Sequence, residues 1–481
     1  MAKRIFITFF YVFLFISAAY SRPMQQVILP NISGMEPIKK EDRILILAPH
    51  PDDEAIGCAS IIQEAVKAGA ELRVVYLTNG DNNQFAFIVY EKRITFRKGE
   101  FIHMGEVRMK EAIKAMEYLG VDRKNLMFLG YPDFGTFAIF TKYWRQGDVY
   151  RSMLTRVNSV PYKNNLSFGA PYQGESILND IKGILLNYKP TKIFVSHPAD
   201  VNGDHKAFYL FLQVALADLR NDIPPAKIYP YLIHFAGWPT PRHYHPSLAL
   251  LPPSRLAESR IKWRSLQMTQ EQIEQKRQAI LCYNSQTQCC AFYLLSFARK
   301  NELFGDYPPI NFSLAARMAD KLSQKEKTAI ERFSAFFDFI NILNKEADSH
   351  NDLDGLYTLP ASFGLAGYGI EGGNLVVRID RGRNTGWNFG VLVYLFGYNY
   401  KTPFKDMPKA IIIARNNKLK VFDGKRRIKS SAVALEMGKK RIVIKVPLVM
   451  LGDPDFILAS IKPYSGLLPM DAVGWRRINV K

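Results

Sequence analysis

Histidines and acidic residues gather in two short stretches of the sequence, each at the end of an apolar run. The first, "APHPDDEAIGC" (residues 48–58), places one histidine and three carboxylates within five positions at the end of "RILILA". The second, "SHPADVNGDH" (residues 196–205), follows "KIFV". A solvated turn needs only one or two such residues, so this density indicates a site that carries out chemistry.

The residue types in these stretches suit a zinc ion that activates water. A catalytic zinc ion typically has three His, Asp or Glu ligands and an open fourth position. His50 and Asp53 lie three residues apart on one loop, and His205 is the best candidate for the third ligand. Asp52 is the predicted general base, and Glu54 would match the charge of the following helix N-terminus. The alternative is that the acidic cluster only caps a helix and that the histidines are ordinary loop residues.

Five β-rich runs between residues 43 and 231 alternate with longer amphipathic stretches. The runs are "RILILA", "LRVVYLT", "NLMFLG", "KIFVSH" and "KIYPYLI". This alternation predicts an α/β domain built on a doubly wound, mostly parallel sheet with helices on both faces. Because ligands bind beyond the carboxyl ends of such strands, both charged stretches are expected at one edge of the sheet.

Two stretches interrupt this rhythm, residues 82–106 and 133–173, and both are aromatic, polar and poor in periodicity. Long loops in a compact domain usually serve as lids or binding walls. We therefore expect Tyr143, Trp144, Tyr150 and Tyr162 to line a binding site.

Several motifs together resemble one enzyme family. "APHPDDEAIG", "RMKEAIKAMEYLG", "FLGYPDFG", "DVNGDHKA", "KRQAILCYNSQ" and "FARKNELF" are similar to the LmbE-like/PIG-L family of zinc-dependent N-acetylglucosaminyl deacetylases, over about residues 43–304. The resemblance implies a Rossmann-like catalytic domain, here given the bounds 41–305. It also implies zinc ligands at His50, Asp53 and His205 and a general base at Asp52.

The resemblance extends to further site residues and departs from the family at one of them. It implies that Arg108 and Asp133 contact substrate and that Asp204 orients an imidazole. Asn202 stands where the family usually has a histidine that stabilises the oxyanion or protonates the leaving amine. Asparagine cannot donate a proton at neutral pH. His197 or a protonated Asp52 would then have to supply that proton.

The C-terminal part of the chain differs in pattern. Residues 306–352 have helical spacing and predict a linker, and residues 353–481 alternate like a β-sandwich. The last strands resemble DOMON-like and family-9 carbohydrate-binding sandwiches. Four aromatic residues there could stack on sugar rings or could fill the sandwich core: Tyr368, Trp387, Tyr398 and Tyr400.

The N-terminus and the overall charge bear on location and partners. Residues 1–21 resemble a secretory signal peptide followed by a leader over 22–40, which predicts export to the periplasm, cell envelope or medium, or retention by an uncleaved anchor. A net charge of +20 favours anionic partners, but no nucleic-acid-binding motif and no multi-span membrane pattern is present. Export permits a disulfide between Cys282 and either Cys289 or Cys290.

The sequence therefore predicts a zinc-dependent deacetylase of an N-acetylated amino sugar, anionic or lipid-linked, in a glycan or glycolipid. The C-terminal sandwich is a further candidate for glycan contact. Two alternatives remain open: a related amidase that acts on a different amide conjugate, and a sugar-binding protein whose site has lost catalysis at Asn202.

Overall fold

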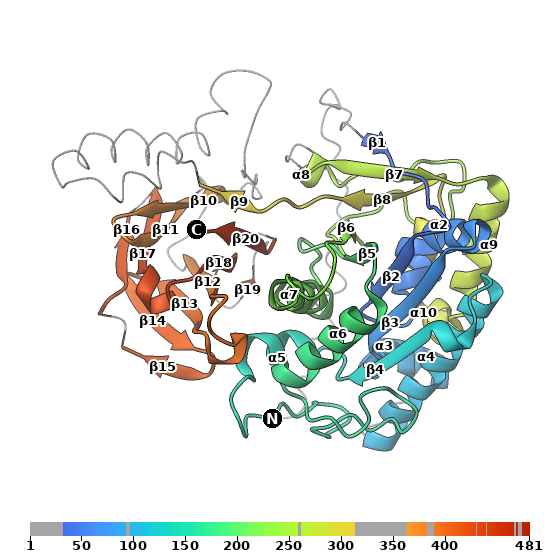
Figure 1. The fold of residues 1–481 in the computed structure, drawn as a ribbon, viewed down its shortest axis with the longest axis horizontal. Helices are drawn as coiled ribbons and strands as arrows, with labels where there is room; N and C mark the ends of the chain where they lie inside the picture. The colour runs from blue at the N-terminus through green and yellow to red at the C-terminus, as the bar shows by residue number, and fades with distance from the viewer. Residues whose placement is uncertain are drawn as a thin grey trace.

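The structure is a computed structural model, which describes residues 32–92, 97–257, 261–312, 363–381, 389–429, 431–438, 440–465, 468–469 and 474–481. The expected signal peptide, most of the expected linker and Trp387 lie outside the described residues. An α/β region and a β-rich C-terminal region lie side by side (Figure 1). None of the helices in the described ranges is long and apolar enough to cross a bilayer.

The α/β region is built on one eight-stranded sheet in the order β1-β7-β8-β6-β5-β2-β3-β4. The five consecutive strands β6-β5-β2-β3-β4, which reach one edge of the sheet, pair in parallel. β8 runs antiparallel to β6 and β7, so the far edge of the sheet is mixed. The strands are β1 (Ile32–Gly34), β2 (Arg43–Ala48), β3 (Glu71–Thr78), β4 (Leu126–Tyr131), β5 (Lys192–Ser196), β6 (Lys227–Tyr231), β7 (Trp263–Gln267) and β8 (Asn301–Gly305).

Helices cover both faces of this sheet. Alternate side chains of β2 enter different cores: Ile44 and Ile46 pack in one, Leu45 and Leu47 in the other. The first core includes α2 (Asp53–Ala68), α4 (Lys98–Tyr118) and α9 (Gln270–Leu281), and the second includes α6 (Gly174–Tyr188) and α7 (Gly203–Asp218). The strand order reverses between β2 and β5, and the two charged stretches begin at the ends of these neighbouring strands.

The expected loop at residues 82–106 is wrong in its main part. Residues 84–91 form α3 (Gln84–Glu91), whose first turn is capped by the Asn83 side chain, and α4 already begins at Lys98. Three other helices complete the region: α5 (Thr136–Lys142), α8 (Ser254–Ala257) and α10 (Asn284–Leu294). All four cysteines are free, so the pairing left open for Cys282 is not formed.

The C-terminal region contains two sheets that share a core, one antiparallel and one antiparallel except for the parallel pair β20 and β9. One has the order β10-β11-β17-β16, and the other the order β15-β14-β13-β12-β18-β20-β9, with β19 beside β18. The strands are β9 (Ile310–Asn311), β10 (Phe363–Glu371), β11 (Asn374–Arg381), β12 (Phe389–Tyr398), β13 (Lys409–Arg415), β14 (Lys418–Asp423), β15 (Arg426–Ile428), β16 (Ala434–Met437), β17 (Arg441–Pro447), β18 (Phe456–Ser465), β19 (Leu468–Pro469) and β20 (Arg476–Asn479). Residues 310–311, inside the expected helical linker, are therefore a strand of this region.

The larger C-terminal sheet packs against α5 and α7 (Figure 1). Phe396 of β12 contacts Phe140 of α5, with ring centroids 5.9 Å apart. Trp144 is buried against Phe404 in the same interface, so its expected place in a binding wall is wrong. Tyr368 and Tyr398 are also buried, so these two rings fill the core of the sandwich. They cannot stack on a glycan.

Candidate metal centre

The loop after β2 delivers three of the predicted residues to the carboxyl edge of the sheet. Asp53 begins α2, and its Oδ2 accepts the backbone N–H of His50 at 2.9 Å, which closes the loop. Asp52 has φ 123°, a backbone conformation that side-chain-bearing residues rarely adopt. Glu54 is buried in the first turn of α2 and accepts the backbone N–H of Asp52. The loop is thus held by its own carboxylates.

The loop after β5 delivers His205 to the same place. His205 lies in the first turn of α7, which Asn202 caps by accepting the backbone N–H of Asp204 at 2.8 Å. The side-chain oxygen of Asn202 is therefore occupied by the helix end. The geometry thus gives Asn202 a structural role as a helix cap. Its NH2 group can still donate to an oxyanion, so the catalytic role stays a prediction.

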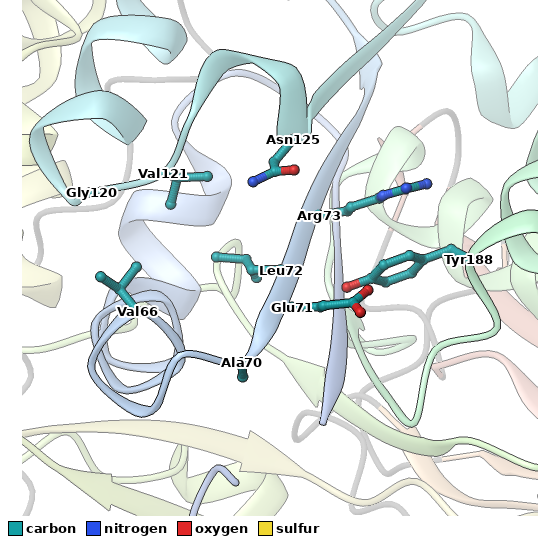
Figure 2. A pocket seen from close by; sticks show the side chains of 9 residues that line it. All are labelled: Val66, Ala70, Glu71, Leu72, Arg73, Gly120, Val121, Asn125 and Tyr188. Atoms are coloured by element: carbon teal, nitrogen blue, oxygen red, sulfur yellow. The ribbon is translucent and has the colours of Figure 1, made fainter. Parts of the chain in front are cut away.

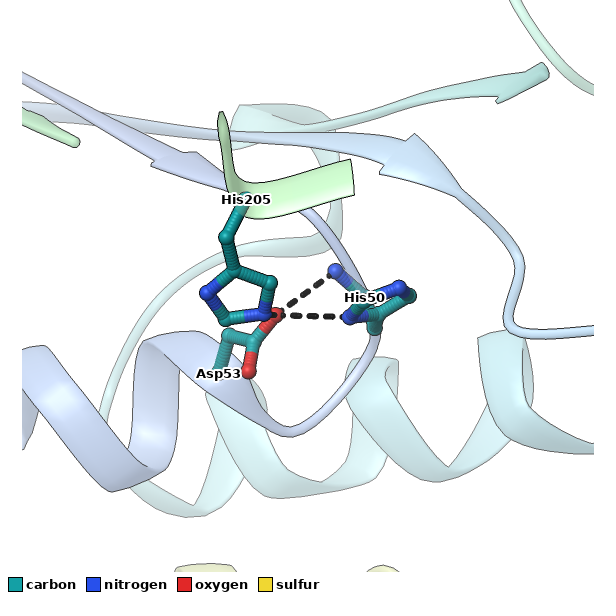
Figure 3. A group of neighbouring side chains, drawn as sticks. All are labelled: His50, Asp53 and His205. Carbon is teal, nitrogen blue, oxygen red and sulfur yellow. Dashed lines mark hydrogen bonds and ion pairs between the residues drawn. The ribbon is translucent and has the colours of Figure 1, made fainter. Parts of the chain in front are cut away.

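The three predicted ligands converge on one oxygen atom. Asp53 Oδ2 lies 3.1 Å from His50 Nδ1 and 3.1 Å from His205 Nε2 (Figure 3). One donor atom from each residue lies within 4.8 Å of the other two. The two imidazole rings are 5.2 Å apart between centroids. Two loops far apart in sequence thus meet as a single His/Asp/His cluster of His50, Asp53 and His205, here called the metal centre.

The donor set of the metal centre fits zinc. Nε2 of the fully buried His205 ring lies 3.1 Å from Asp53 Oδ2 but makes no hydrogen bond within the described residues. A buried nitrogen without a hydrogen bond is expected where a metal ion takes its lone pair. Two imidazoles and one carboxylate are also the ligand types that a catalytic zinc site uses while it keeps one position open.

A second carboxylate stands behind each ligand histidine. His50 Nε2 lies 3.3 Å from Asp204 Oδ2 and 3.1 Å from Asp133 Oδ1. His205 Nδ1 lies 3.1 Å from Asp200 Oδ2. A carboxylate in this place fixes the tautomer, so that the opposite nitrogen of the ring presents its lone pair to the metal. Asp204 thus contacts an imidazole in the manner that the resemblance implies.

Asp52 lies next to the metal centre and faces Arg108. Arg108 Nη2 is 3.3 Å from Asp52 Oδ2, and the same guanidinium donates to the backbone oxygens of Pro51 and Gly80. Burial raises the pKa of Asp52 to about 7, although the Arg108 charge opposes the rise. A carboxyl with a pKa near 7 can both accept and return a proton at neutral pH. Arg108 is buried and positions Asp52. The substrate contact that the resemblance implies for Arg108 stays a prediction.

Of the two remaining predicted residues, Asp133 and His197, only Asp133 lies at the metal centre. Asp133 lies at the metal centre: its Oδ2 accepts the backbone N–H of Asn82, and its Oδ1 faces His50. His197 does not, because its ring packs between Trp263 and Tyr307, and its Nδ1 accepts the Ala199 backbone N–H. Burial lowers the pKa of His197 to about 3. His197 therefore cannot replace the missing histidine as a proton donor.

Sequence reasoning missed two residues at the metal centre and undervalued a third. Asp200 supports His205, and Asp81 accepts a hydrogen bond from Tyr162 and one from the Asp133 backbone. The sequence leaves open whether His234, after the run "YPYLI", faces the cleft or is an ordinary core or strand-end histidine; its ring centroid lies 4.7 Å from that of His205. Their position in the sequence could have revealed them, because each of these residues follows a strand that neighbours β2 or β5 in the sheet.

A separate cavity of about 410 Å³ lies at the opposite edge of the sheet. It is lined by the start of β3, the segment before β4 and the end of α6, with Arg73 over the ring of Tyr188 (Figure 2). This cavity lies at the amino ends of the parallel strands. It contains no residue of the metal centre and plays no part in the chemistry considered below.

Comparison with known proteins identifies the first part of the chain. Residues 45–216 match the PIG-L family profile, described as GlcNAc-PI de-N-acetylase, so these residues form a PIG-L-type domain. This range contains His50, Asp52, Asp53 and His205. No curated protein matches the chain.

Solved structures give weaker likenesses. N,N'-diacetylchitobiose deacetylase from Pyrococcus horikoshii is 19% identical, with 52% of this chain and 72% of that chain covered and a TM-score of 0.33. A40926 pseudoaglycone deacetylase Dbv21 is 16% identical (55% and 96% covered, TM-score 0.35). GalB, the 4-carboxy-2-hydroxymuconate hydratase from Pseudomonas putida KT2440, is 15% identical (57% and 99% covered, TM-score 0.34). Likenesses this low carry no argument about activity.

Proposed function

We propose that this protein is an exported, zinc-dependent deacetylase that hydrolyses the acetamide of an N-acetylglucosamine-type sugar in a glycan or glycolipid. One observation carries the proposal. Within the residues matched by the GlcNAc-PI de-N-acetylase profile, donor atoms of His50, Asp53 and His205 converge beside the Asp52 carboxylate. Amide hydrolysis assisted by a metal needs this combination of ligands, an open position and an adjacent base.

The residues of the site divide the reaction among them. A bound zinc ion supplies Lewis acidity and lowers the pKa of water towards about 7. Asp52 accepts a proton from the water that attacks the acetyl carbonyl carbon, while Arg108 holds the carboxylate in place. When the tetrahedral intermediate breaks its C–N bond, Asp52 returns the proton to the leaving amine. Acetate and a free amino sugar result, and neither Asn202 nor His197 is needed as an acid.

Charge and the N-terminal sequence support the proposed substrate and location. The net charge of +20 favours an anionic or lipid-phosphate-linked sugar, because opposite charges steer encounter. Residues 1–21 have the pattern of a secretory signal, which would bring the enzyme to envelope glycans. Glycan contact through the C-terminal region has less support, since Tyr368 and Tyr398 are buried.

The test is acetate release by the zinc-loaded full chain from short N-acetylglucosamine oligomers, lipid-linked N-acetylated sugars and cell-wall fragments. We expect release from at least one class and a loss of about 10²–10⁴-fold in kcat for Asp52→Asn, because the general base is removed. Asp122→Asn, an exposed carboxylate paired with Lys124, is the matched control and should behave as wild type.

Two outcomes would contradict the proposal. Release of a fragment other than acetate would identify a related amidase that uses the same metal centre. Binding of the oligomers without any hydrolysis, with zinc bound in stoichiometric amount, would identify a sugar-binding protein. Full activity of Asp52→Asn would remove the proposed mechanism even if acetate is released.

A further inference from the structure

Phe134 has an unusual backbone conformation at the edge of the metal centre. It directly follows Asp133, whose Oδ1 lies 3.1 Å from His50 Nε2. Its φ is 55°, in the left-handed region that glycine adopts freely and that bulky residues avoid. A conformation of this kind persists only where the surrounding structure enforces it, and such residues cluster at functional sites.

The backbone of Phe134 explains how the conformation is enforced. Its N–H donates to Asp204 Oδ2 at 2.6 Å, and the same oxygen lies 3.3 Å from His50 Nε2. Thr136 completes the arrangement by donating its backbone N–H to Asp204 Oδ1. These contacts need only the backbone at position 134. Glycine would make them without strain, so they do not explain why a phenylalanine is present.

The side chain of Phe134 has no structural role that would offset this strain. Phe134 is 60% exposed, whereas Phe140 in α5 and Trp144 just after α5 are buried. Tyr150 lies on the adjoining backbone: a Cβ at Gly135 would meet Tyr150 Cε1 at 2.6 Å. An exposed aromatic residue therefore directly follows Asp133, with its backbone fixed by Asp204 at the metal centre and a second, half-buried aromatic residue against the next position in the chain.

We propose that Phe134 is a substrate-binding residue whose ring stacks on the apolar C–H face of a pyranose ring. The inference rests on the proposed function and assigns the sugar to this side of the metal centre. Aromatic faces carry partial negative charge and attract the polarised C–H groups of such a ring. The strained backbone keeps the platform in place before substrate arrives, which lowers the ordering cost of binding.

The test compares Phe134→Gly with wild type in two measurements. Removal of the ring should raise KM for the N-acetylglucosamine oligomers about tenfold with kcat within about threefold, because ring stacking contributes to binding. Removal of the left-handed strain should raise the melting temperature by about 2 °C. Phe134→Tyr keeps the ring and should restore the wild-type KM. If Phe134 had a purely structural role, its replacement by glycine would not weaken substrate binding and stabilise the fold at the same time.

Lys189→Gly is the matched control. Lys189 is exposed, has φ 49° and ends α6 away from the metal centre, so this variant should gain stability without any change in KM. A Phe134→Gly variant with wild-type KM, or with a lower melting temperature, would overturn the inference. If no oligomer is hydrolysed, the proposed function fails instead. Saturation-transfer NMR with the same oligomers then tests whether the Phe134 ring stacks on the sugar. Equal saturation-transfer signals from wild type and Phe134→Gly would overturn the stacking.

Discussion

At the scale of single residues, the metal centre depends on carboxylates outside the set His50, Asp53 and His205. Asp200 is the clearest case. Its Oδ2 faces His205 Nδ1 and accepts the backbone N–H groups of Ile233 and His234, while its Oδ1 accepts that of Asn202. Asp200 therefore ties the ligand histidine to the ends of two neighbouring strands.

Replacement of Asp200 by asparagine should weaken zinc binding. Both side-chain oxygens of Asp200 face N–H groups, so the NH2 group of an asparagine would meet another donor in either orientation. The His205 ring would lose its orienting contact as a result. We expect about a 10–100-fold loss in zinc affinity, measured by competition with a chelating dye. Asp222→Asn, an exposed carboxylate elsewhere, serves as control. Unchanged affinity in a folded Asp200→Asn protein would show that the carboxylate does not orient the ligand.

At the scale of elements, the N-terminus of α7 links helix stability to the position of His205. Asn202 caps this helix through the Asp204 backbone N–H. Loss of an N-cap side chain typically costs about 1 kcal/mol. Asn202→Ala should lower the free energy of unfolding by that amount in urea titrations, whereas Asn202→Ser keeps an acceptor and should lower it little.

Activity measurements on the same two variants separate the cap from a catalytic role. We expect the cap to be the main role of Asn202, so acetate release by Asn202→Ala should stay within about threefold of wild type under stabilising conditions. A tenfold drop in kcat with unchanged stability would instead assign Asn202 to the oxyanion, as the resemblance first implied.

How far the sequence could predict these elements follows from the kind of signal that each one carries. β2 and β5 are short continuous apolar runs, and the ligands follow them directly, so strands and His50, Asp53 and His205 could be placed together. α3 was missed because "QFAFIVYE" is apolar on most sides, which hides any helical period. Trp144 was misplaced because the surface that buries it belongs to residues about 260 positions later.

At the scale of the whole molecule, the C-terminal region supports the loop that carries Asp200. Trp475, just before β20, is buried and donates its backbone N–H to Pro198 O at 3.1 Å. Its ring lies 6.0 Å from Phe137 of α5 and 5.3 Å from Tyr394 of β12, measured between centroids. The two regions thus share an apolar interface that ends at the β5 loop, and they are expected to unfold together.

Trp475→Ala tests this coupling. Loss of a buried tryptophan should cost about 3–5 kcal/mol, and because the ring lies in the shared interface, the whole described fold should melt in one transition at a lower temperature. Zinc should raise that single melting temperature, because a ligand that binds only the native state stabilises everything that unfolds with it. Val449→Ala, 70% exposed in the same region, should melt as wild type does. Two separate calorimetric transitions, of which zinc moves only one, would show that the C-terminal region folds independently of the metal centre.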